Sequence, residues 1–217
     1  MKARAATPAW LAALLLGACT PRAEQPAPAD IQAARQAVLA FEQQLRREIT
    51  ARLERNEDPV AVYMSYADHA PGWGREISNR FELDFSRTAL GVRNPSNAPD
   101  AWESLQLETF NFLMDAGLDP DTFENAEIVQ EGEETVFRWI QPVRMLDTCL
   151  VCHGEEIDPR IKLMLAQEYP LDEAGGYAEG QIGGAYSVRK VLRAGDDPAP
   201  AWTPILEPEA PSASVQQ

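Results

Sequence analysis

The sequence predicts one domain of mixed α/β (α+β) class that begins with a long helix. Apolar residues recur at steps of three and four over residues 31–53, which marks one face of an amphipathic helix. Apolar and polar residues alternate over residues 134–145 and 181–190, as they do in strands. A chain of 217 residues, less a leader at its N-terminus, has room for one core of ordinary size. These observations favour helices and strands in a single folding unit.

Two helices and a strand are predicted for the first half of this domain. The second helix has Asp58 at its N-cap position and Pro59 in its first turn. It is expected to end near His69, because a proline and a glycine follow soon after. Residues 81–92 alternate like a strand. The asparagines and prolines of residues 93–100 then favour turns.

The second half adds two helices to the two strands already described. A helix is predicted over residues 99–116, with Gly117 at its C-terminal end. Asp158 and Pro159 mark the start of a short helix between the strands. Glycines are frequent over residues 175–184 but lack the spacing of a phosphate-binding loop, so a turn is predicted there.

Residues 1–18 have the composition of a secretory signal peptide. Lys2 and Arg4 precede an apolar run that is too short to span a bilayer. The segment LGAC at residues 16–19 resembles a bacterial lipobox, which implies that Cys19 is lipidated and becomes the mature N-terminus. An ordinary signal peptide with an incidental cysteine is the alternative.

Composition divides the remaining chain into three parts. Residues 19–30, rich in proline and alanine, are predicted to form the lipid anchor and an extended tether. Residues 31–193 are predicted to fold, and residues 194–217, with many prolines and few apolar residues, to form a disordered tail. The lipid anchor is therefore the expected contact with the membrane.

The segment Cys149-Leu150-Val151-Cys152-His153 contains two of the three cysteines. Its C-x-x-C-H spacing is the attachment signature of a c-type haem. Two thiols three positions apart can each bond to one vinyl group of the porphyrin. The histidine that follows is then held beneath the iron as a ligand.

Other uses of the two thiols remain open. A zinc site needs about four ligands from cysteine, histidine or carboxylate, but outside the motif the chain has one other histidine, His69, and one other cysteine, Cys19. A thioredoxin-like dithiol normally opens a helix in an α/β unit, whereas this motif follows a strand pattern and has no proline between its cysteines. An oxidising compartment disfavours free thiols, so a disulfide is a further alternative.

Acidic residues outnumber basic ones by 34 to 19, and the formal net charge is −15. This charge disfavours nucleic acid as a partner, because binding phosphates needs a basic surface. An acidic surface suits a basic redox partner through electrostatic steering. Solubility alone explains the charge equally well.

The run R-N-P-S-N-A-P-D-A-W-E fills residues 93–103, upstream of the C-x-x-C-H motif. Arg87-Thr88, Pro142-Val143 and the run G-G-A-Y-S-V at residues 183–188 accompany it. In this combination the chain resembles the Tll0287-like family, also called the DUF3365 domain, over roughly residues 31–192. The resemblance implies a PAS-like fold with an antiparallel sheet, a long N-terminal helix and flanking helices.

The same resemblance implies one covalently bound haem c, in a domain that occurs alone or as the extracytoplasmic sensor of signalling proteins. Carried onto the matching positions, Cys149 and Cys152 make the thioether bonds and His153 binds the iron. Family members often carry a cysteine before an Ala-Pro pair, which could serve as a second axial ligand. Here Ser65 stands near that position, ahead of Ala70-Pro71, and serine is a poor iron ligand.

Three other residues could fill the second axial position. His69 is preferred, because it lies four residues after Ser65 on the same helical face and imidazole is a good iron ligand. Met64 and Met145 are further candidates, although methionine more often fills a core. A surface position for His69 and an open, five-coordinate iron are the alternatives.

The two propionates of a haem need positive charge or water around them. Arg87, Arg93 and Arg144 are the candidates, because each lies in or beside a segment expected near the pocket. An ordinary surface position is the alternative for any one of them. Aromatic residues that could line the haem, or simply pack the core, are Phe85, Trp102, Trp139 and Tyr186.

Two functional hypotheses of different classes follow. The first is a lipid-anchored, monohaem c-type cytochrome that transfers single electrons on the periplasmic side of a bacterial membrane. Thr20 after the lipidated cysteine favours the outer membrane, and a homodimer through the first helix stays open. The second is a haem-based redox or gas sensor that acts through a partner protein. An enzyme ranks third, because the chain has no second haem motif.

Overall fold

The computed structural model describes residues 25–193. The predicted signal peptide (1–18), Cys19 and the predicted tail (194–217) lie outside the described residues. The helices are α1 (Pro28–Leu45), α2 (Ala51–Glu54), α3 (Pro59–Phe81), α4 (Ala101–Asp115), α5 (Asp147–His153) and α6 (Pro159–Glu168). The strands are β1 (Asp84–Thr88), β2 (Asn125–Glu131), β3 (Glu134–Arg144) and β4 (Ile182–Leu192). Among these helices none is long and apolar enough to cross a bilayer.

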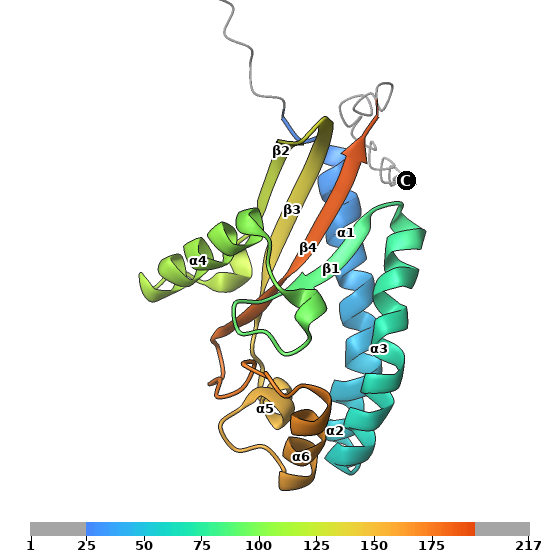
Figure 1. Ribbon diagram of the computed structural model, residues 1–217, viewed down its shortest axis with the longest axis vertical. Helices are drawn as coiled ribbons and strands as arrows, with labels where there is room; N and C mark the ends of the chain where they lie inside the picture. The colour runs from blue at the N-terminus through green and yellow to red at the C-terminus, as the bar shows by residue number, and fades with distance from the viewer. Residues whose placement is uncertain (1–24, 194–217) are drawn as a thin grey trace, which may run out of the picture.

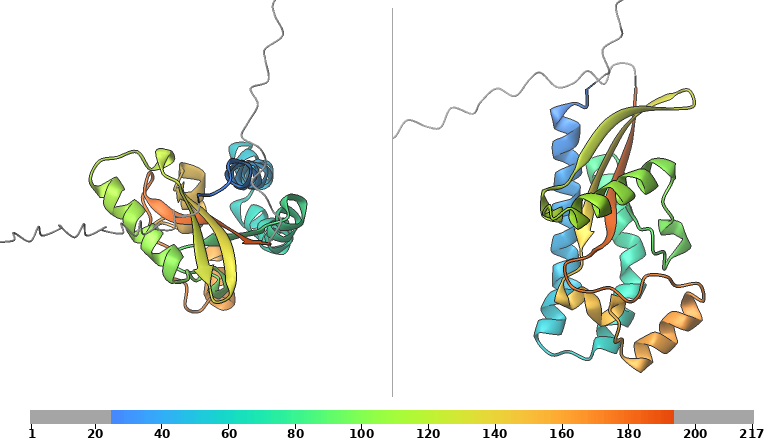
Figure 2. Two further views of the ribbon diagram at one scale, coloured as in Figure 1. Left: turned by 90° about the horizontal axis from the view of Figure 1, so that it is seen from above. Right: turned by 90° about the vertical axis from the view of Figure 1, so that its left-hand side faces the viewer.

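The four strands form one antiparallel sheet in the order β1-β4-β3-β2. Helices α1 and α3 lie side by side on one face of the sheet, and α4 lies on the other (Figures 1 and 2). Helices α5 and α6 lie together at one end of the sheet (Figure 1). The arrangement confirms the predicted α/β (α+β) class with a long N-terminal helix and flanking helices.

Each face of the sheet has its own apolar core, because side chains alternate along a strand. Trp139 of β3 is fully buried and packs in one cluster with Phe41 of α1 and Trp73 of α3. The next residue of the strand, Ile140, points to the opposite face and packs with Leu107 of α4. The sheet is therefore the middle layer of three.

Helix α1 begins at Pro28 rather than at Ile31, so the predicted tether at residues 19–30 is too long. Proline suits the first turn of a helix, because its φ is preset and no N–H is needed there. A π-helical turn, Arg46–Thr50, and then α2 continue the helical path to Glu54. The predicted helix over residues 31–53 is thus confirmed apart from its start and this turn.

Helix α3 passes the Pro71-Gly72 pair and ends only at Phe81, so the predicted end near His69 is wrong. Trp73 and Ile77 follow that pair, and both are buried in the core that α3 shares with α1 and the sheet. Burial of their side chains outweighs the weak helix preference of proline and glycine at one position each.

Two predicted helix starts are confirmed, because Asp58 and Asp158 each cap a helix whose first turn contains proline. Helix α4 begins at Ala101 rather than at Pro99, because Asp100 caps it in a reciprocal capping box with Glu103. Strand β1 is shorter than the predicted 81–92, because α3 takes the first of those residues. Strand β2 was not predicted, because its half-buried sequence N-A-E-I-V-Q-E lacks a clear alternation.

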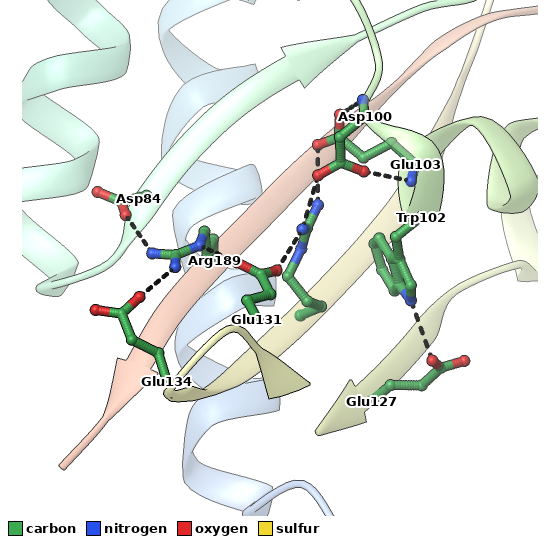
Figure 3. Close-up of polar contacts among 9 residues, drawn as sticks. Asp84, Asp100, Trp102, Glu103, Glu127, Glu131, Glu134 and Arg189 are labelled. Carbon is green, nitrogen blue, oxygen red and sulfur yellow. Dashed lines mark hydrogen bonds and ion pairs between the residues drawn. The ribbon is translucent and has the colours of Figure 1, made fainter. Parts of the chain in front are cut away.

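The buried Arg138 fastens α4 to the sheet. Its Nη1 lies 2.8 Å from a carboxylate oxygen of Asp100 and 2.8 Å from one of Glu131. Its guanidinium lies 4.6 Å from the centre of the Trp102 ring. Figure 3 shows how Asp100, Trp102 and Glu103 at the start of α4 face strands β2 and β3. The D-A-W-E end of the predicted motif thus serves packing, and Trp102 lies on the α4 face.

Candidate functional site

The C-x-x-C-H motif forms helix α5, directly after β3 (Figure 1). Two backbone hydrogen bonds fix the chain just before this helix. Met145 N donates to Gln181 O, and Gly180 N donates to Met145 O, both at 2.8 Å. The sequence pattern did not predict this helix, because seven residues contain too few repeats to show a helical period.

Helix α5 places the two thiols one turn apart. Cys149 and Cys152 are three positions apart, so their side chains leave α5 on neighbouring sides. Both are half-buried, and they do not form the alternative disulfide. Cys152 packs beside Tyr63 and Ile161. Burial raises the pKa of its thiol.

His153 ends α5 with a fixed ring orientation. Its Nδ1 lies 2.7 Å from the carbonyl oxygen of Ala174. Because a carbonyl oxygen only accepts, Nδ1 carries the proton and Nε2 keeps the lone pair that can bind a metal. Burial, with a smaller contribution from the charge of Arg93, lowers the pKa of His153 to about 4. The ring is therefore neutral at pH 7.

Arg93 fastens the loop that follows α6 to the motif. Its Nη2 donates to Cys152 O at 2.7 Å and to Ala174 O at 3.2 Å, and its Nε donates to Asp172 Oδ2 at 3.0 Å. Asp172 Oδ1 in turn accepts from Ala174 N at 2.8 Å. Arg93 was one of three candidates for a propionate contact, and in the structure its Nε and Nη2 bind a carboxylate and two backbone carbonyls of the protein.

The same loop pairs with the end of the motif. Tyr177 N donates to His153 O at 3.0 Å, and Gly176 N donates to Gly154 O at 3.1 Å. A Cβ on Gly154 would stand 2.7 Å from Leu150 O, closer than real contacts allow. The chain can turn this tightly after the histidine because glycine occupies that position.

A cation and two tyrosines lie on the face of the sheet that α1 and α3 cover. The guanidinium of Arg87 in β1 lies 5.8 Å from the centre of the Tyr66 ring. Burial is the main cause of the low pKa of His153, and the charge of Arg87 adds to it. Burial likewise raises the pKa of Tyr186, with small contributions from charged neighbours that include Cys149. Arg87 and Tyr186 therefore lie within electrostatic reach of the motif, and Tyr66 contacts Arg87.

Three of the predicted wall aromatics, Phe85, Trp139 and Tyr186, lie in the core on this face of the sheet. The ring centres of Phe85 and Tyr186 are 5.8 Å apart in a stacked arrangement. Tyr63 of α3 was not predicted, and its hydroxyl donates to Glu168 Oε2 at 3.0 Å. The helical period of α3 could have identified Tyr63 as a core-facing residue.

His69 lies away from the side of α3 that packs with the motif. Its ring is exposed, and Nδ1 lies 2.7 Å from the carbonyl oxygen of Ser65. Ala67 packs in the same cluster as Cys152. His69 comes two residues after Ala67, so it leaves the helix about 160° away from it.

The other predicted candidates are also used elsewhere or exposed. Met64 is 51% exposed. Met145 is buried against Gly183, where a Cβ would stand 2.9 Å from the methionine sulfur. Arg144 pairs with Asp121. The structure thus brings Cys149, Cys152, His153, Arg87 and Arg93 together from the predicted set.

Over the described part of the chain, no three His, Cys, Asp or Glu side chains gather as a metal site would require. The zinc alternative therefore has no ligand set within residues 25–193. Asp172 and Ala174 are the supporting residues that the sequence did not reveal. Ala174 acts through its backbone carbonyl, which residue type does not indicate, and Asp172 belongs to no recognisable motif.

Comparisons with known proteins identify the family and a protein of similar fold. A family model described as Tll0287-like matches residues 23–190. Among solved structures, the crystal structure of the cyanobacterial heme-protein Tll0287 is similar, with 18% identity and a TM-score of 0.55. The match covers 77% of this chain and 98% of that chain, and at this identity it shows the fold alone. No curated protein matches the chain.

Proposed function

The chain belongs to the Tll0287-like family, and from this premise we propose that it is a haem protein with one covalently attached haem c. The observation that carries the proposal is the arrangement on α5. Two unbridged thiols stand one turn apart, beside a neutral histidine whose Nε2 keeps its lone pair. These are the groups that c-type attachment requires, so the residues present fit the cofactor.

In this proposal Cys149 and Cys152 would hold the haem through two thioether bonds, and His153 would offer Nε2 to the iron. The Ala174 carbonyl keeps the proton on Nδ1 and fixes the direction of the ring. Haem bound here supplies an iron that takes up and releases one electron.

Arg87 is the arginine that we propose for a propionate contact. It is half-buried, and among the described residues its contacts are the aromatic rings of Phe41 and Tyr66. Its charged nitrogens are thus available to an anion. Arg93 and Arg144, the other two candidates, already bind carboxylates of the protein.

We further propose that the protein transfers single electrons as a lipid-anchored cytochrome on the periplasmic side of a bacterial membrane. The signal-peptide composition of residues 1–18 and the lipobox that ends at Cys19 support this location. The net charge of −15 favours a basic redox partner and disfavours nucleic acid.

Covalent attachment is tested with protein made in cells that carry out cytochrome c maturation. After acid-acetone extraction, the protein is expected to keep its haem band, and the double variant Cys149→Ser, Cys152→Ser is expected to lose it. Thr148→Ser, which leaves both thiols in place, is the matched control. Haem that survives extraction in the double variant contradicts the proposal.

A redox or gas sensor that acts through a partner protein is the second candidate. One observation favours it: the α3 residues that pack with Cys152 include Tyr63, already bonded to Glu168, and Ala67, which has no ligating atom. An iron with an open position is then expected to bind carbon monoxide rapidly when reduced. Slow or absent binding, with fast electron exchange, favours the carrier instead.

A further inference from the structure

The carbonyl oxygen of Ala174 accepts from two donors at once. His153 Nδ1 lies 2.7 Å from it, and Arg93 Nη2 lies 3.2 Å from it. The same Nη2 also donates to Cys152 O at 2.7 Å. The Arg93 side chain is only 13% exposed, so water screens these contacts little. A buried cation therefore stands directly behind the acceptor that orients the proposed iron ligand.

We propose that Arg93 is a positioning residue that raises the reduction potential of the iron bound by His153, acting through the Ala174 carbonyl. This inference rests on the proposed haem site. The resemblance assigned no such role to Arg93.

Competition for one acceptor gives the direction of the effect. A strong acceptor at Nδ1 draws the proton and makes the imidazole a more basic ligand. A more basic ligand stabilises ferric iron over ferrous iron. Arg93 takes part of the lone-pair density of Ala174 O, so the hydrogen bond from His153 Nδ1 to this oxygen weakens. The positive charge of Arg93 also disfavours the ferric state, and both effects raise the potential.

The negative charge of Asp172 has the opposite effect on the reduction potential, so the proposal predicts shifts of opposite sign for the two residues. Its Oδ2 accepts from Arg93 Nε at 3.0 Å, and its Oδ1 accepts from Ala174 N at 2.8 Å. Asparagine keeps an oxygen for one of these bonds but removes the negative charge. Neutralising Arg93 is therefore expected to lower the potential, and neutralising Asp172 to raise it.

The experiment compares the potentials of purified holoprotein by spectroelectrochemical titration. We expect Arg93→Gln to shift the one-electron equilibrium about tenfold towards ferric, or about 59 mV downward. Asp172→Asn is expected to shift it upward. Arg35→Gln is the matched control, because Arg35 of α1 pairs with Glu124, just before β2, and not with a residue of the motif, so its loss is expected to leave the potential unchanged. Arg93→Lys keeps the charge without the fork of donors and is expected to fall between wild type and Arg93→Gln.

A second readout separates this mechanism from a propionate contact or a purely structural one. The chain has two histidines, so ¹⁵N NMR of histidine-labelled protein resolves His153 from His69. We expect the Nδ1 resonance of His153 to move in Arg93→Gln and to stay in Arg35→Gln. If Arg93→Gln does not fold, the reduction potential and the Nδ1 resonance of Asp172→Asn and Arg93→Lys test the proposal instead.

The possible failures are distinguishable. Haem present with potentials and Nδ1 resonance equal to wild type in the Arg93 and Asp172 variants overturns the inference and leaves the proposed function standing. A wild-type protein without covalent haem overturns the proposed function. In that case the Nδ1 resonance still reports whether Arg93 weakens the bond from His153 to Ala174.

Discussion

Gly154 determines how closely the chain can turn after the proposed iron ligand. Its φ is −75°, which any residue can adopt, so the restriction comes from the 2.7 Å approach to Leu150 O. We expect Gly154→Ala to destabilise the protein by about 1–3 kcal/mol and to reduce haem loading. Calorimetry and the ratio of Soret to protein absorbance measure the two effects. Gly175→Ala is the control, because nothing lies within 4 Å of a Cβ there.

His69 gives a prediction in which sequence and structure differ. If His69 bound the iron, as its sequence position suggests, His69→Ala would convert a low-spin iron to a high-spin one. The structure places the ring on an exposed side of α3, about 160° from Ala67. We therefore expect the oxidised spectrum of His69→Ala to equal that of wild type. A high-spin spectrum in the variant would assign His69 to the iron after all.

Single residues show which parts of the site could be predicted from the sequence. Cys149, Cys152 and His153 were identified because their chemistry depends on residue type and spacing. The group that orients the His153 ring could not be identified from the sequence, because it is the backbone carbonyl of Ala174. Arg93 was placed near the motif, but its partner Asp172 is 79 positions away, and such a contact depends on the tertiary fold.

At the scale of elements, Arg138 holds helix α4 on strand β3. Its side chain is buried and lies within ion-pair distance of Asp100, Glu103 and Glu131. Removing Arg138 leaves these carboxylates without their cation, but Asp100 and Glu131 are 49% and 31% exposed, so water solvates them in part. We expect Arg138→Gln to lower the free energy of unfolding by about 1.5–3 kcal/mol, measured with urea. Arg35→Gln, which breaks an exposed pair, is expected to have a much smaller effect.

The same cluster makes stability depend on pH. Burial raises the pKa of Asp100 and Glu131, but Arg138 and further donors together outweigh it, so both pKa values are lowered. The further donors are the backbone N–H of Glu103 for Asp100 and the guanidinium of Arg189 for Glu131. A carboxylate with a lowered folded-state pKa contributes stability at neutral pH that is lost as pH falls below its ordinary value near 4. We expect this acid-side loss in wild type and a flatter profile in Arg138→Gln. If the free energy of unfolding fell equally with pH in wild type and in Arg138→Gln, Arg138 would not be the cause of the acid-side loss.

Elements were predictable where local chemistry decides and not where packing decides. The starts of α3, α4 and α6 follow from Asp58, Asp100 and Asp158, whose side chains accept from backbone N–H groups close by. The continuation of α3 past Pro71-Gly72 depends on core contacts that no local pattern contains. Strand β2 at the sheet edge is half-buried, so its alternation is weak.

At the scale of the whole molecule, charge is the property that a partner meets first. The formal net charge is −15, and the proposed redox partner is basic. Long-range attraction of this kind speeds encounter and is screened by salt. We expect the second-order rate of electron exchange with a basic cytochrome to fall steeply between low and physiological ionic strength, measured by stopped flow. An acidic partner is the control and is expected to react faster as salt is added.

The loop that binds and orients His153 consists of residues 172–177, which follow the motif by some twenty positions. A polypeptide that crosses a membrane from its N-terminus delivers the two cysteines first and this loop afterwards. In the proposed export, both sulfurs would be open to an attachment enzyme during that interval, whereas in the finished fold they are half-buried. Under the proposed covalent attachment, the order of the chain would thus set an interval for cofactor insertion that ends when the loop arrives.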